Sequence, residues 1–143
     1  MGQGLRTARL IDVALRYHAP ADVHYAGIDL LEARAAAQTT GLTLKKAHRL
    51  LRNRGIRAHI VPGDPLNALS RIANRLQGYE LVLIAADQDA ESLAQAWFYL
   101  PRMLAADCQI FQEQRSETKT KLVPITAAQL EALAASRPRR AAA

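Results

Sequence analysis

The stretch that decides the fold is IRAHIVPGDPLNALSRIANRLQGYELVLIAA, residues 56–86. Its first six residues, 56–61, favour a strand, and residues 80–86 form a continuous apolar run typical of a buried parallel strand. Between them, Asp64 at the N-cap and Pro65 at the first helical position predict a helix, which a glycine then ends. This order of strand, helix and strand predicts a βαβ unit.

The rest of the chain continues the alternation. The other expected elements are a helix over 4–17, a strand over 23–29, a helix from 30 interrupted at 39–41, a helix over 43–55, a helix over 90–105, strands over 108–114 and 120–125, and a last helix over 126–136. Alternation at this spacing predicts an α/β fold: a Rossmann-like three-layer sandwich with a mostly parallel sheet. We expect a single domain over 1–136 and a basic disordered tail over 137–143.

Composition bounds the class of protein. Half of the 143 residues are apolar, and much of that share is Ala and Leu. No apolar run approaches the roughly 18 residues that span a bilayer, and the N-terminal residues lack the apolar stretch of a secretory signal. These features predict a cytoplasmic protein with no membrane partner. The single Cys108 excludes an intramolecular disulfide and is expected to pack in the core.

The net charge of +6 is unevenly distributed. Residues 41–63 carry only basic charges, and Lys45, Arg49 and Arg52 fall on one face of the expected helix. Such a face can bind the phosphates of a nucleic acid, but no aromatic residues alternate with these bases to stack on nucleobases. We therefore interpret this face as solvated, with nucleic-acid binding as the alternative.

Ligands of open α/β sheets bind beyond the carboxyl ends of the strands, which directs attention to three acids. Asp29 can accept hydrogen bonds from a ribose diol, or it can cap the next helix. Asp64 is explained as an N-cap that could also face a ligand. Asp87 could act as a general base, or lie in solvent beside a capping Asp89. The histidines and acids do not have the spacing of metal ligands, so the sequence predicts no metal site.

Four motifs resemble those of class I S-adenosylmethionine-dependent methyltransferases, a Rossmann-like family. They are GQG (2–4), YAGIDLLEAR (25–34), HIVPGDPLNAL (59–69) and ELVLIAADQDAES (80–92), and the resemblance spans residues 2–113. It implies S-adenosylmethionine as cofactor, with cofactor contacts at Gly2, Gly4, Asp29 and Asp64. It also implies that Asp87 lies near the methyl acceptor, whose identity the sequence does not give. In the family's metal-dependent branch the fourth strand ends on an acid, whereas this chain has Ala85.

The larger departure from the family is its first strand, which has no counterpart before Gly2. That strand lies between the ones ending at Asp29 and near Ala85, so two parallel strand edges would lose their partner. We expect the fold to be N-terminally truncated, with the strand encoded upstream. The alternatives are direct pairing across the gap or a homo-oligomer. Two other functions stay open: an NAD- or nucleotide-binding Rossmann module, and a non-catalytic nucleotide-sensing or interaction domain.

Overall fold

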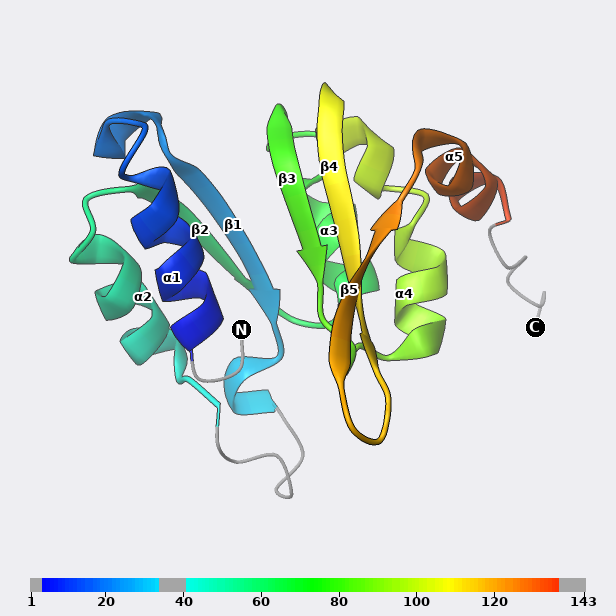
Figure 1. Cartoon of the computed structure of the whole chain (residues 1–143), viewed down its shortest axis with the longest axis horizontal. Coiled ribbons are helices and arrows are strands. Elements are labelled where there is room, and N and C mark those ends of the chain that lie inside the picture. Colours follow the sequence, from blue (N-terminus) through cyan, green and yellow to red (C-terminus); the bar gives the residue numbers. More distant parts are fainter. Residues whose placement is uncertain (1–3, 34–40, 137–143) are drawn as a thin grey trace. The chain divides into compact units, whose positions relative to one another are not determined.

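The structure, a computed structural model, describes residues 4–33 and 41–136 (Figure 1). Expectations for residues 1–3, 34–40 and 137–143, which include Gly2 and the basic tail, lie outside the described residues. The chain divides into two compact units, unit 1 (Met1–Asp64) and unit 2 (Pro65–Ala143).

Unit 1 contains a parallel strand pair and two α-helices. Its elements are α1 (Leu5–Ala14), the 3₁₀ turn η1 (Pro20–Asp22), β1 (His24–Asp29), the 3₁₀ turn η2 (Leu31–Ala33), α2 (Leu44–Arg52) and β2 (Arg57–Pro62). The two strands are in register from His24 opposite Arg57 to Asp29 opposite Pro62. Helix α2 begins where Thr43 accepts a hydrogen bond from the Lys46 backbone N–H at 3.3 Å, as the sequence predicts.

Unit 2 contains a three-stranded sheet of order β3-β4-β5. Its elements are α3 (Pro65–Ile72), β3 (Tyr79–Ile84), α4 (Ala90–Ala96), η4 (Leu100–Met103), β4 (Leu104–Arg115), β5 (Thr120–Ile125) and α5 (Ala127–Ala135). Strands β3 and β4 are parallel, and β4 and β5 are antiparallel. The helix expected over 90–105 ends earlier because Pro101 cannot continue it, and β4 already starts at Leu104.

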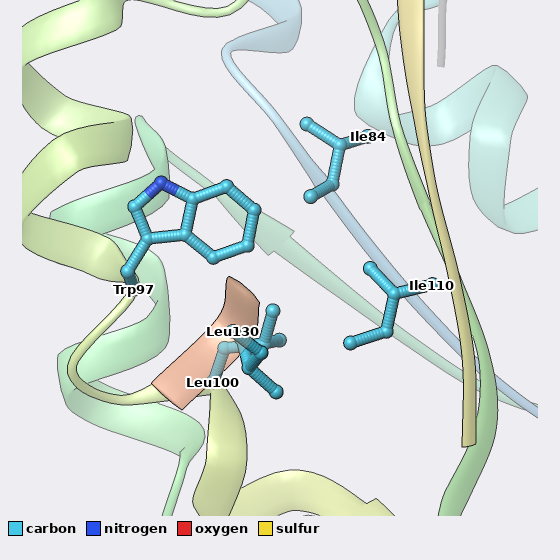
Figure 2. Close-up of a cluster of buried hydrophobic side chains, with 5 residues drawn as sticks. All are labelled: Ile84, Trp97, Leu100, Ile110 and Leu130. Carbon is cyan, nitrogen blue, oxygen red and sulfur yellow. The ribbon is translucent and has the colours of Figure 1, made fainter. Parts of the chain in front are cut away.

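The core of unit 2 forms around Trp97, of which 5% is exposed. Figure 2 shows its indole extending toward Ile84 of β3 and Ile110 of β4, and Leu100 and Leu130 complete the buried cluster. The two following aromatics, Phe98 and Tyr99, are only half-buried. The Arg102 guanidinium lies 4.9 Å and 5.8 Å from their ring centres. Trp97 is the C-cap of α4, and the two aromatics that follow it lie in the turn before η4.

The mixed α/β class is confirmed, but the strands form two sheets in place of the single sheet expected. Along the described residues, β1 pairs only with β2, and β3 pairs only with β4. The Rossmann-like sandwich, and the additional strand that would complete it, therefore stay predictions. In the methyltransferase family, the missing first strand would lie between the strands that correspond to β1 and β3.

Gly4 has a structural reason to be glycine at the start of α1. Its φ is 81°, in the left-handed region that L side chains rarely adopt. A Cβ at this position would also lie 2.5 Å from Leu42 Cδ1 and 3.0 Å from Leu50 Cδ2. Backbone conformation and close packing thus account for this glycine without a ligand, which the sequence argument did not foresee.

Candidate functional site

The carboxyl ends of β1 and β2 bring two of the predicted site residues close together in unit 1. Asp29 is the last residue of β1 and lies opposite Pro62, the last residue of β2. The Gly63 N–H donates a 3.0 Å hydrogen bond to the Asp29 carbonyl oxygen, and Asp64 follows directly. The strand end that the sequence predicts for Asp29 is confirmed, and Asp64 directly precedes Pro65, where α3 begins.

The Asp29 carboxylate already has a structural role. Its Oδ1 accepts a 2.8 Å hydrogen bond from the backbone N–H of Leu31, which starts the turn η2. Leu31 is buried, and its φ of 50° is the one positive value among the described non-glycine residues. The carboxylate therefore stabilises the turn that follows β1. Asp29 thus caps a turn, as one of the two sequence-based interpretations expects, although the element is a 3₁₀ turn and not an α-helix. The contact with a ribose stays a prediction.

Tyr25 and Thr7 extend this cluster toward α1. Tyr25 lies four residues before Asp29 on β1, so both side chains leave the same face of the strand. The Tyr25 hydroxyl is 3.4 Å from Thr7 Oγ1 on α1. Burial raises the pKa of Tyr25, the hydrogen bond with Thr7 opposes this, and the negative charge of Asp29 raises the pKa further. The phenol therefore stays protonated at neutral pH and can donate a hydrogen bond.

The N-terminal end of α1 lies at the same end of unit 1 as the carboxyl end of β1 (Figure 1). The first N–H groups of a helix have no intrahelical partners, and the helix dipole favours negative charge there. Gly4 occupies the N-cap position, so it supplies no capping side chain. This end of unit 1 therefore has a carboxylate at Asp29 and the backbone N–H groups of the first turn of α1, which favour an anion.

Asp87 lies in unit 2, exposed in the turn between β3 and α4. Its neighbour Asp89 caps α4, since its Oδ1 accepts a 2.7 Å hydrogen bond from the Ser92 N–H, which confirms the capping interpretation for Asp89. The Ser92 hydroxyl oxygen in turn accepts a 3.0 Å hydrogen bond from the Leu66 N–H of α3. The catalytic role of Asp87 stays a prediction.

A buried carboxylate that the sequence analysis missed lies beside this turn. Glu113 of β4 is 5% exposed, and its Oε2 accepts a 3.1 Å hydrogen bond from the backbone N–H of Ala86. An acid is thus present at the carboxyl end of β3, but the neighbouring strand supplies it. Among the described residues no cluster of three or more His, Cys, Asp or Glu side chains is arranged to hold a metal ion.

The basic side chains on α2 point into solvent. Lys45, Arg49 and Arg52 are all exposed, as expected of a solvated face. Arg54 differs from them, because its Nε donates a 2.8 Å hydrogen bond to Asp12 Oδ1 of α1. This ion pair links α1 to the residues that follow α2.

None of the described helices is both long and apolar enough to traverse a lipid bilayer.

A groove of about 490 Å³ lies in unit 2 between the β4–β5 hairpin and α5. Both polar and apolar side chains line it. The polar ones include Gln112 and Gln129, and the apolar ones include Val123 and Leu133. None of the predicted site residues lines it.

Cys108 is half-buried at the margin of the hydrophobic core of unit 2, and its pKa is raised by burial and by the charges of Asp107 and Glu80.

Comparisons with protein-family models, with curated proteins and with solved structures find no match to this chain. The resemblance to methyltransferases therefore rests on the sequence motifs alone.

Proposed function

We propose that the protein binds an adenosine-containing cofactor at the carboxyl ends of β1 and β2, as a methyltransferase-like protein that uses S-adenosylmethionine. The observation that carries the proposal is the position of Asp29 at the end of a parallel strand, hydrogen-bonded through its carbonyl to Gly63. In open α/β sheets this is the edge where ribose diols are bound by an acid.

In this proposal each residue has a limited task. Asp29 accepts hydrogen bonds from the ribose hydroxyls while its Oδ1 keeps the turn at Leu31. Gly63 lacks a side chain, which lets the ligand approach the backbone, and Asp64 lies near the adenine. The resemblance to methyltransferases, and no contact in the structure, assigns Asp87 of unit 2 to the methyl acceptor. Methyl transfer then proceeds by positioning the two reactants.

A second candidate is a nucleotide- or NAD-binding module. It is favoured by the N-terminal end of α1, which lies at the same end of unit 1 as Asp29 (Figure 1). Backbone N–H groups and the helix dipole at this end suit a phosphate, which S-adenosylmethionine lacks. A non-catalytic sensing role would use the same residues, so ligand preference is the measurement that separates these functions.

The test is calorimetric titration of the chain with S-adenosylhomocysteine, NAD and ATP, followed by the variant Asp29→Asn. Asparagine keeps an oxygen that can accept from Leu31 N–H, but it loses the charge that strengthens hydrogen bonds to ribose. We expect the dissociation constant to rise by about tenfold, for a loss of about 1.4 kcal/mol, with little change in melting temperature.

The matched control is Asp22→Asn, an acid of unit 1 that lies before β1 in η1, away from its carboxyl end. It should leave affinity unchanged. Binding of S-adenosylhomocysteine but not NAD or ATP would support the methyltransferase-like function, and the reverse preference would support the nucleotide module. Absence of binding by all three ligands, or an Asp29→Asn variant that binds as the original does, would contradict both.

A further inference from the structure

The two outer strands of the unit 2 sheet have very different sequences. Strand β5 carries Lys121 and Pro124, and charged residues and proline are the features that protect an exposed strand edge from pairing. Strand β3 reads YELVLI, with Glu80 as its one charge and no proline. The sequence of β5 therefore disfavours pairing at its outer edge, whereas the sequence of β3 lacks proline and has one charged residue to oppose pairing.

Leu81 of β3 belongs to an apolar run that the sequence assigns to a buried strand, yet its side chain is 48% exposed. Leu122 of β5 is exposed to nearly the same extent, 47%, so the two outer strands differ in sequence and not in side-chain exposure. Within the described part of the chain, β4 is the one strand that pairs with β3. The outer edge of an apolar strand presents backbone N–H and C=O groups that a matching strand can pair with.

We propose that the β3 edge is the homodimer interface of this protein, where β3 pairs antiparallel with β3 of a second copy. A two-fold axis is the commonest symmetry of soluble oligomers, and it pairs identical edge strands antiparallel. With the axis at Leu81, this residue lies opposite its own copy and Glu80 lies opposite Val82, because directly opposite residues of antiparallel strands must share one face of the sheet. No like charges then face each other, and the two three-stranded sheets become continuous.

Charge around β3 favours the same arrangement. Arg75 precedes the strand, whereas Asp87 and Asp89 follow it. Antiparallel pairing brings the amino end of one β3 next to the carboxyl end of the other. The basic residue of each copy then approaches the acidic turn of its partner, twice per dimer. A parallel arrangement would instead bring like charges together at each end, which disfavours it.

The experiment is sedimentation analysis of the full chain from about 1 µM to about 100 µM, a range that covers weak to moderate dissociation constants. We expect a monomer–dimer equilibrium. Leu81→Lys places on β3 the protection that β5 already has, and we expect the dissociation constant to rise at least tenfold. Leu122→Lys is the matched control, because Leu122 lies on β5 and is 47% exposed; it should leave the equilibrium unchanged.

A charge exchange tests the orientation independently of the folding of the Leu81 variant. Arg75→Glu should weaken the dimer severalfold, and combining it with Asp87→Arg should restore the original dissociation constant. A chain that stays monomeric over the whole range would overturn the proposal. So would equal weakening by the two lysine variants, or a double exchange that gives no recovery. None of these three results bears on cofactor binding at β1 and β2, so the two proposals fail separately.

Discussion

Replacing Trp97 by alanine should remove a large part of the stability of unit 2. The side chain is 5% exposed and packs with Ile84, Leu100, Ile110 and Leu130 (Figure 2). Burial of about 150–250 Å² at about 25 cal/mol per Å² corresponds to about 4–6 kcal/mol. Alanine keeps part of this burial, so we expect a loss of about 4 kcal/mol, within the range of about 3–5 kcal/mol that is typical of Trp→Ala. Small domains have only about 5–15 kcal/mol in total.

The assay is urea unfolding followed by far-ultraviolet circular dichroism. Tryptophan fluorescence would not serve, because Trp97 is the single tryptophan of the chain and the variant lacks it. Phe98→Ala is the matched control: Phe98 is the next residue, half-buried under the Arg102 guanidinium, and its loss should cost about 1 kcal/mol. A Trp97→Ala loss below about 2 kcal/mol, or one no larger than that of Phe98→Ala, would refute this account of the core.

Two further predictions concern polar contacts. The hydrogen bond from Arg54 and its positive charge lower the pKa of Asp12 below 3.8, so this pair stabilises unit 1 above that pH and the effect fades as pH falls through the lowered pKa. Arg54→Ala should return the Asp12 pKa toward 3.8, measured by NMR titration, and an unchanged pKa would contradict the pairing. Thr126→Ala removes the hydroxyl of a capping box with Gln129 and should cost about 1 kcal/mol in urea unfolding, whereas Thr126→Ser should cost little.

Features fixed by neighbouring residues could be predicted from the sequence. Thr43, Asp89 and Thr126 each accept a hydrogen bond from a backbone N–H three residues later, so their capping depends only on local chain geometry. The end of β1 at Asp29 is predictable for the same reason, because a polar residue interrupts an apolar run there.

Features that depend on residues far apart in the chain could not be predicted from the sequence. Glu113 looks like an ordinary polar position on a strand, and only the parallel pairing of β3 with β4 places its carboxylate against Ala86 N–H. The approach of Tyr25 to Thr7 likewise requires α1 to pack on β1. The beginning of β4 at Leu104 depends on pairing with Tyr79, which propensity within residues 90–105 does not reveal.

The two units use carboxylates in a common way, and this limits what either carboxylate can do for a ligand. After β1, Asp29 Oδ1 accepts the N–H of Leu31; after β3, Glu113 Oε2 accepts the N–H of Ala86. In each unit an acid satisfies a backbone donor at the carboxyl end of a parallel strand, where an unsatisfied N–H would cost about 1–3 kcal/mol. A ligand that took over the Asp29 carboxylate entirely would pay that cost at Leu31. Binding at this edge must therefore leave the bond to Leu31 in place, which is why asparagine at position 29, rather than alanine, separates a ligand contact from a turn.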